Sequence, residues 1–236
     1  AEHIDGNRFT IVVRDLARNT THEMDRRAHV LRDGDGLLVV NYFGDQRFGS
    51  ARHGGGFAAR HLVRGEFEQA LRLLVGTPAR KDQGATRTMT RAAATHWGDW
   101  NRILDEMPRM PERGPFEALA AGKDFREAFA ALPQFLQAMC VEAFQSHLWN
   151  AIARRFVERR TDAKLLLTAE DPFGPTAFPF ARCVDEPTRG LILPLFGPET
   201  QFEAAWADDA NEPRNEVNAI PSTIRWHPFI ARSPYR

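Results

Sequence analysis

The longest regular pattern in this sequence runs from Pro133 to Arg160. Its apolar side chains recur every three or four residues, the spacing that gathers side chains on one face of an α-helix. A proline suits the first helical turn, and the arginines near the other end are favoured by the helix dipole. We therefore predict one long helix, whose apolar face comprises Phe135, Leu136, Met139, Cys140, Ala143, Phe144, His147, Leu148, Ile152 and Phe156.

Shorter helical patterns precede this segment. They share apolar residues at helical spacing and are bounded by glycine or proline. The predicted helices cover residues 58–74 with a break near Arg64-Gly65, 85–107 as one or two helices, 116–121 and 125–132. A further helix is predicted over Thr20–His29, where Thr20 or Thr21 can cap the first turn.

Strand signals are fewer. Phe9, Ile11 and Val13 fall on one face of the segment 9–14, which predicts a half-buried strand entered through a turn at Gly6. Residues 33–36 form a turn signal, and residues 165–167 and 191–193 are interpreted as short strand-like runs. A strand-containing start, a helical middle and a mixed end favour an α+β fold.

The composition limits the class of protein. The chain has 236 residues, is 43% hydrophobic and carries 31 basic and 31 acidic residues, so it can bury a core and is formally neutral. Neutrality leaves nucleic acid open as a partner, because only a face that touches phosphates needs positive charge. Two cysteines are too few for a disulfide framework or a four-thiolate zinc site. The apolar runs are shorter than the roughly 20 residues of a membrane span, so we expect a soluble, cytoplasmic protein.

Two patterns that could hold a ligand have simpler interpretations. The run Gly54-Gly55-Gly56 precedes a helical segment but lacks the Lys-Ser/Thr of a phosphate-binding P-loop, which favours a flexible loop. His53 and His61 have no acidic or thiolate partner at ligand spacing, and we predict no metal site.

Four separated motifs carry a resemblance to a known family. They are Gly6-Asn7-Arg8-Phe9, the block Asn41-Tyr42-Phe43-Gly44-Asp45-Gln46-Arg47-Phe48-Gly49, the helical stretch Glu142-Ala143-Phe144-Gln145-Ser146-His147-Leu148-Trp149-Asn150, and Leu193-Pro194-Leu195-Phe196-Gly197. In this order and at these spacings they resemble motifs of the TruD-type tRNA pseudouridine synthases. The resemblance spans residues 6–197.

The resemblance implies a partial pseudouridine synthase catalytic core, a β-sheet with helices, that carries a mostly α-helical TruD-type insertion domain. We assign residues 1–40 to the core, 41–205 to the insertion domain and 206–236 to a truncated return towards the core. The block at 41–49 is then the joint between core and insertion. The residues given this structural role are Asn41, Tyr42, Phe43, Gly44, Gln46, Phe48, Gly49, Gln145, Ser146, Trp149 and Asn150.

Enzymes of this family break the C1′–N1 bond of a uridine, turn the base and rejoin it through C5. The resemblance implies tRNA as substrate, at uridine 13 or a similar site, with no cofactor, no metal and a monomeric protein. An aspartate carboxylate acts at the sugar, and the target base leaves its stack. Asn7 and Phe9 match the amide and aromatic positions beside that aspartate and are expected to support the pocket. The alternatives, a turn residue for Asn7 and a core residue for Phe9, stay open.

The catalytic aspartate itself is not identified. In the family it lies in a G-x-K-D-x-x-A-x-T-x-Q stretch before the G-N-x-F strand, whereas here Asp5 has neither the lysine nor the A-x-T. The segment 80–87 resembles that stretch, but its order and spacing differ, so Asp82 is interpreted as part of a solvated linker. We assign no catalytic residue and expect this chain to be incomplete and inactive alone.

The segment from Asp45 to Arg91 contains nine basic and four acidic residues, which favours an RNA-binding face. Ordinary solvated helix surfaces are the alternative interpretation. The residues expected to contact RNA are Arg8, Arg47, Arg52, Arg60 and Lys81. Two hypotheses remain open: a tRNA pseudouridine synthase, or a non-catalytic RNA-binding or interaction module derived from that family.

Overall fold

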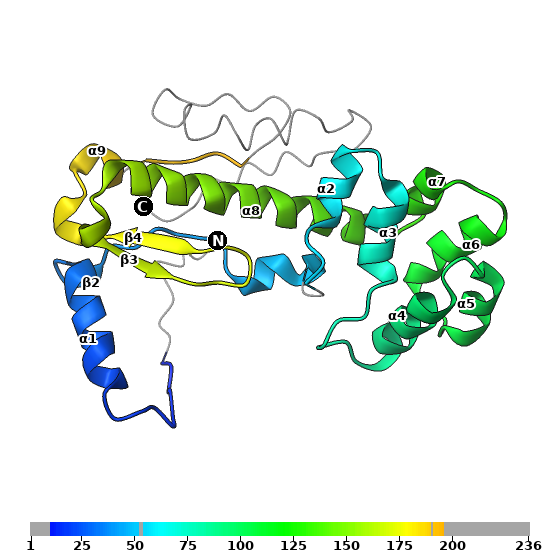
Figure 1. The fold of residues 1–236 in the computed structure, drawn as a ribbon, viewed down its shortest axis with the longest axis horizontal. Helices are drawn as coiled ribbons and strands as arrows, with labels where there is room; N and C mark the ends of the chain where they lie inside the picture. Colours follow the sequence, from blue (N-terminus) through cyan, green and yellow to red (C-terminus); the bar gives the residue numbers. More distant parts are fainter. Residues whose placement is uncertain (1–9, 52–53, 190, 196–236) are drawn as a thin grey trace, which may run out of the picture.

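Residues 10–51, 54–189 and 191–195 are described by a computed structural model of the chain (Figure 1). A long helix, α8 (Gln134–Arg160), lies along the longest dimension of the fold. Several short helices gather at one of its ends, and small two-stranded sheets lie towards the other (Figure 1). This mixture, rich in helix and poor in strand, is compatible with the predicted α+β class.

The predicted long helix is confirmed, with two local corrections. Pro133 is the N-cap residue, with ψ at 131°, and does not belong to the first turn. Phe135 was expected on the apolar face but is 73% exposed. Successive residues of a helix point about 100° apart, and at this turn Leu136 is the residue that packs against the core. The arginines at the far end, Arg159 and Arg160, lie in the last turn as predicted.

The helices between the Asn41–Gly49 block and α8 also follow the sequence pattern. They are α2 (Ala58–Val63), α3 (Phe67–Val75), α4 (Gly84–His96), α5 (Trp100–Glu106), η2 (Pro111–Arg113), α6 (Gly114–Ala120) and α7 (Phe125–Ala130). The predicted break falls at Gly65, whose φ of +72° favours glycine. Asp99 caps α5 through a side-chain bond to Arg102 N, and Asp124 forms a capping box with Glu127 at α7.

These helices enclose the first of two cores along α8, which we call the distal core. It is lined by apolar side chains from α2 to α7 and by the first third of α8. Each large apolar side chain buried there contributes about 1.5–3 kcal/mol. Its members include Leu62, Leu71, Ile103, Phe116, Phe129 and Cys140, each 6% exposed or less.

The second core, which we call the joint core, lies along the rest of α8. A small antiparallel sheet covers it, made of β3 (Leu166–Ala169) and β4 (Thr176–Pro179), and 3₁₀ turn η3 (Ala163–Leu165) leads into β3. The sheet confirms the strand predicted near 165–167, displaced by one residue. Buried members of this core are Ala59, Phe144, Leu148, Ile152, Ala153, Phe156, Val157, Ala177 and Leu193.

Residues 20–37 form a helix and a tight hairpin. Helix α1 (Thr20–Leu31) confirms the prediction, but its N-cap is Asn19, without a side-chain capping bond, and not Thr20 or Thr21. The turn signal at 33–36 connects β1 (Arg32–Asp33) to β2 (Gly36–Leu37), which pair antiparallel.

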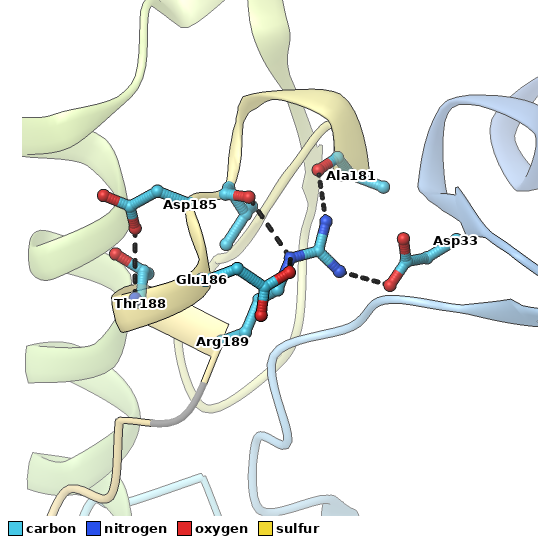
Figure 2. A network of polar contacts seen from close by, with 7 residues as sticks. Asp33, Ala181, Asp185, Glu186, Thr188 and Arg189 are labelled. Carbon is cyan, nitrogen blue, oxygen red and sulfur yellow. Dashed lines mark hydrogen bonds and ion pairs between the residues drawn. The ribbon is translucent and has the colours of Figure 1, made fainter.

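A polar network fastens this hairpin to a segment distant in the sequence. Arg189, at the end of α9 (Glu186–Arg189), forms an ion pair with Asp33 and donates to the carbonyl oxygens of Ala181 and Val184 (Figure 2). Ala181 belongs to 3₁₀ turn η4 (Ala181–Cys183), which α1 also contacts. One guanidinium therefore holds together chain segments separated by more than 150 residues.

Two strand predictions are wrong for the described residues. Residues 10–14 form no strand, and Ile11, Val12 and Val13 are 82%, 68% and 56% exposed. Their alternation would suit a strand, but a strand forms only when a neighbouring strand satisfies its main-chain hydrogen bonds. None of the described residues pairs with this segment. Phe9 lies outside the described residues.

Residues 191–193 are not a strand either. The carbonyl oxygen of Leu193 accepts a hydrogen bond from the Trp149 indole, at 2.9 Å. This carbonyl is therefore paired with a side chain and not with the main chain of a neighbouring strand. Leu193 is nevertheless buried in the joint core, which accounts for its apolar character.

None of the described helices has both the length and the apolar character needed to cross a bilayer. Within the same residues, no group of three or more His, Cys, Asp or Glu side chains is arranged to hold a metal ion.

The close approach of α6 and α7 gives a test of the distal core. A Cβ atom added at Gly114 would lie 2.5 Å from the main-chain oxygen of Ala131. We expect Gly114→Ala to lower the free energy of unfolding by about 1–3 kcal/mol in urea denaturation, because a main-chain neighbour cannot rotate away. The gain in helix propensity, about 1 kcal/mol, is too small to reverse the sign. Gly44→Ala is the control, since no atom lies within 4 Å of its added Cβ; equal effects of both substitutions would contradict the prediction.

Candidate functional site

The Asn41–Gly49 block packs against the Glu142–Asn150 stretch of α8, and together we call these two segments the motif joint. Its most specific contact is between Asn150 and the main chain of Phe43. The Asn150 side-chain oxygen accepts from Phe43 N at 2.9 Å, and its amide nitrogen donates to Phe43 O at 2.9 Å. Phe43 lies outside any helix or strand, so this amide supplies the partners that secondary structure otherwise would.

Arg47 forms the polar side of the motif joint. It lies in 3₁₀ helix η1 (Asp45–Ala51), donates from Nε to Ser146 Oγ at 3.2 Å and pairs through Nη1 with Glu142 Oε2 at 3.2 Å. Its guanidinium also lies 5.5 Å from the centre of the Phe43 ring. The Ser146 hydroxyl donates to Glu142 O, so it receives Arg47 while remaining bonded to its own helix. The Arg47 side chain keeps 36% of its surface exposed.

Tyr42 connects the block to strand β4. Its hydroxyl donates to Ala177 O at 2.8 Å and accepts from Ala177 N at 3.3 Å. Its ring meets Phe178 and Trp149 edge to face, with centroids 5.4 Å and 6.4 Å away. Burial raises the pKa of the Tyr42 hydroxyl to about 12, although its hydrogen bond to Ala177 acts in the opposite direction.

Trp149 brings together three of the four sequence motifs. Its ring packs edge to face on Phe43 at 5.4 Å, and its indole N–H donates to Leu193 O at 2.9 Å. The second and third motifs and the start of the fourth therefore meet around one side chain. Leu193 is the first residue of the fourth motif, whose end lies outside the described residues.

An aromatic cluster completes the motif joint on its other side. Phe48 is 1% exposed and lies between Phe57 and Phe173, at centroid distances of 6.0 Å and 4.6 Å. The Phe57 and His147 rings lie 4.6 Å apart between centroids and are tilted by 31°, and a ring nitrogen of His147 lies 3.0 Å from Phe173 O. The loop between β3 and β4 is thus held against α8 through rings of the motifs.

The remaining motif residues divide between surface and interior. Asn41, Gly44 and Gln46 are exposed, and Gly49 is half-buried. Gln145 and Ser146 are buried at 7% and 0% exposure.

Two of the residues predicted to contact RNA are exposed. Arg60 lies on α2, 6.0 Å from the Phe144 ring, and Lys81 lies in the turn before α4. The residues Asn7, Arg8, Phe9 and Arg52 lie outside the described part, so their roles stay predictions.

Asp82 has a structural role in the turn that precedes α4. Its Oδ2 accepts from Ala79 N at 2.9 Å and from Thr90 Oγ1 at 3.0 Å. Both donors belong to the same turn and helix, and Thr90 is buried. These bonds support the interpretation of Asp82 as a linker residue and not a nucleophile.

Two contacts that organise this site are not predicted by the sequence analysis. Neither the Asn150 pairing with Phe43 nor the Tyr42 bridge to Ala177 has a local signal, because the partners lie 107 and 135 residues apart. Helix α4 also carries two exposed arginines, Arg87 and Arg91, that the sequence analysis does not single out. Their signal in the sequence is a spacing of four residues within a helix, Gly84–His96, that contains no acidic residue.

Comparison with known proteins places this geometry in a family context. A family model described as tRNA pseudouridine synthase D (TruD) matches residues 1–170. Among curated proteins, tRNA pseudouridine synthase D of Aquifex aeolicus is 35% identical over 158 residues, which cover 66% of this chain and 39% of that protein. The probable tRNA pseudouridine synthase D of Thermococcus onnurineus is 33% identical over 160 residues, covering 66% and 37%. The probable tRNA pseudouridine synthase D 1 of Methanococcus maripaludis is 27% identical over 158 residues, covering 65% and 39%. The matching part of the chain thus spans somewhat under two-fifths of the length of these relatives.

The Asn150 contact can be tested by stability. Asn150→Ala removes both hydrogen bonds and leaves the half-buried main chain of Phe43 without those partners. We expect the free energy of unfolding, measured by urea denaturation, to fall by about 2–3 kcal/mol. Asn101→Ala is the matched control, because Asn101 is exposed on α5 and makes no side-chain hydrogen bond among the described residues. Similar losses in the two variants would show that the pairing adds nothing.

The Tyr42 hydroxyl predicts a pH dependence at high pH. Its pKa is about 12 in the folded chain and about 10 when unfolded. Below pH 10 both states keep the proton; between pH 10 and 12 only the unfolded chain releases it readily, so stability falls with rising pH in that window. We expect the loss to be on the order of 2 kcal/mol relative to Tyr42→Phe, whose unfolding free energy lacks this component. Parallel pH profiles of the two proteins would refute the assignment.

Proposed function

Because this chain belongs to the TruD family of tRNA pseudouridine synthases, we propose that it serves the isomerisation of uridine to pseudouridine in tRNA. The observation that carries the proposal is the family match over residues 1–170, which includes the first three motifs. Two of these motifs pack against each other in the motif joint and are connected there by side-chain hydrogen bonds. The names of the curated relatives support the same reaction and the same substrate class.

The proposed reaction breaks the C1′–N1 bond of the nucleoside and forms a C1′–C5 bond. N1 gains a proton and C5 loses one, so atoms and electrons balance without an added oxidant or reductant. The target is uridine 13 of tRNA or a similar site. Asn7 and Phe9 are proposed to line the pocket that receives the base, where an amide and an aromatic ring can orient and stack it.

The proposed domain division keeps residues 1–40 with the catalytic core and 41–205 as the insertion domain, with residues 206–236 returning towards the core. Support comes from the position of the motif joint at the start of the second range. The described part of that range is mostly helical and contains both cores. The ion pair of Arg189 with Asp33 provides a contact across the proposed boundary.

Exposed cations are proposed to engage the tRNA backbone. Arg47 retains an exposed edge beside its contacts with Ser146 and Glu142, and Arg60 and Lys81 are exposed. Arg8 and Arg52 are proposed for the same role from the sequence pattern. Phosphate contacts of this kind position an RNA without reading its sequence.

A second candidate function, an RNA-binding or interaction module without catalysis, is favoured by one observation on this chain. The 236 residues contain no G-x-K-D-x-x-A-x-T-x-Q stretch, and in the similar segment the Asp82 carboxylate accepts hydrogen bonds from Ala79 N and Thr90 Oγ1. We therefore propose that the 236-residue chain binds tRNA and does not isomerise uridine by itself.

A chimera separates the two candidate functions. The segment of the Aquifex aeolicus relative that aligns with this chain is replaced by the matching 158 residues. We expect the chimera to form pseudouridine in a tRNA transcript, detected by carbodiimide modification and primer extension, and the 236-residue chain to bind that transcript without forming product. A transcript with cytidine at the target position is the control and should give no signal.

Two outcomes would count against these proposals. A folded chimera that neither binds nor modifies tRNA would overturn the proposed function. Product formed by the 236-residue chain alone would overturn the proposed inactivity. In that case, loss of product in Asp5→Asn or Asp82→Asn would locate the nucleophile.

A further inference from the structure

A shallow hollow of about 330 Å³ lies between α4 and α5, away from the motif joint. Its polar lining consists of Arg87, Thr88, Arg91, Thr95, His96 and Glu106. All but Glu106 lie on α4, at positions that repeat with the helical period. This part of the molecule lies at the opposite end of the fold from α1 and α9 (Figure 1).

The positive charge of this hollow is not neutralised by its own helix. Helix α4 contains no Asp or Glu, whereas α1 and α5 place a carboxylate three or four residues from their cations. Arg91 is exposed and has no ion-pair or hydrogen-bond partner among the described residues. Arg87 donates from Nε only to the main-chain oxygen of Asp82, at 2.7 Å, and retains its full charge.

The one carboxylate at the edge of the hollow is already engaged. Glu106 Oε1 lies 3.1 Å from His96 Nε2 and 3.2 Å from Arg102 Nε. Glu106 is therefore occupied by His96 and Arg102, and it leaves Arg87 and Arg91 to interact with a ligand. The bond from Arg87 to Asp82 O also keeps the turn that carries Arg80 and Lys81 next to the helix. Both of these side chains are exposed and extend the positive surface.

The position of Arg87 opposes the stability of its helix. It lies near the N-terminal end of α4, where the helix dipole disfavours a cation, and the first turn holds no acidic residue to compensate. Real proteins depart from such local rules at functional sites.

The lining identifies the chemistry of the ligand. It combines guanidinium groups with the hydroxyl of Thr95, which can donate to phosphate and sugar oxygens, whereas the Thr88 hydroxyl donates to Gly84 O at 3.4 Å. Its one aromatic ring is the His96 imidazole, which is held 3.1 Å from Glu106 Oε1, and it contains no Phe, Tyr or Trp on which a base could stack. A phosphate backbone fits this surface better than an exposed base does.

We propose that this hollow, which we call the α4 groove and which is centred on Arg87 and Arg91, binds the phosphate backbone of the tRNA substrate at a place remote from the motif joint. The proposal rests on the proposed function. It assigns the groove to holding the body of the RNA, without sequence preference, while the target nucleotide is handled elsewhere.

The test measures binding of a labelled tRNA transcript to the full 236-residue chain over a range of salt concentrations. Arg87→Gln/Arg91→Gln should weaken binding about tenfold or more at low salt and reduce the slope of log K against log salt by about two. Arg26→Gln/Arg27→Gln is the matched control. It removes two arginines from an exposed helix face where both are paired with Glu23, and its slope should stay near that of the unaltered chain.

Two further variants protect the test against loss of folding. Arg91→Gln alone disturbs no contact within the described residues and should reduce the slope by about one. Arg87→Lys/Arg91→Lys keeps the charge and should keep most of the slope. An unchanged slope in the double Gln variant, with tRNA binding intact, would overturn the groove and leave the proposed function standing. Absence of tRNA binding by the unaltered chain would overturn both.

Discussion

The pairing of one amide side chain with the main chain of one residue organises this fold. Asn150 holds Phe43 at both its N–H and its carbonyl oxygen, and so fixes an irregular segment against the middle of a long helix. The neighbouring contacts depend on that placement. Tyr42 can reach Ala177, and Arg47 can reach Ser146 and Glu142, only where the main chain between them follows this course. An amide is suited to the task because it donates and accepts side by side, as a peptide unit does.

Helix α8, which carries Asn150, runs through both cores of the fold. Its first third contributes Cys140 and Val141 to the distal core, and Phe144, Ile152 and Phe156 belong to the joint core. Helix α8 therefore connects the motif joint to the distal core, where α4 packs against α3 and α5. If the motif joint and the α4 groove touch one RNA, the span between them is set by α8 together with the packed helices of the distal core.

The helical part of the fold was predictable because its signal is local. Periodicity alone located α8 within one residue, and the glycine at position 65 marked the break between α2 and α3. The strand predictions at 10–14 and 191–193, which rested on local pattern alone, were wrong. Residues 10–14 alternate as a strand does, yet their structure depends on a partner that the pattern cannot supply. The candidate site was recognised through its motifs, but its geometry was not, since an amide such as Asn150 gives no sign of which distant peptide it binds.

The contacts of the motif joint and of the Arg189 network close very large loops of chain. Phe43 and Asn150 are separated by 107 residues, Tyr42 and Ala177 by 135, and Asp33 and Arg189 by 156. The entropy lost in closing a loop grows with the logarithm of its length, at roughly 0.6 kcal/mol for each doubling. The helices from α2 to α7 pack mainly on neighbours in the chain, although α3 also contacts α7 and α2 contacts α8, whereas the joint must gather ends of the chain that begin still farther apart. In the assembly of this fold, we therefore expect the segment by which the family is recognised to be among the last to find its place.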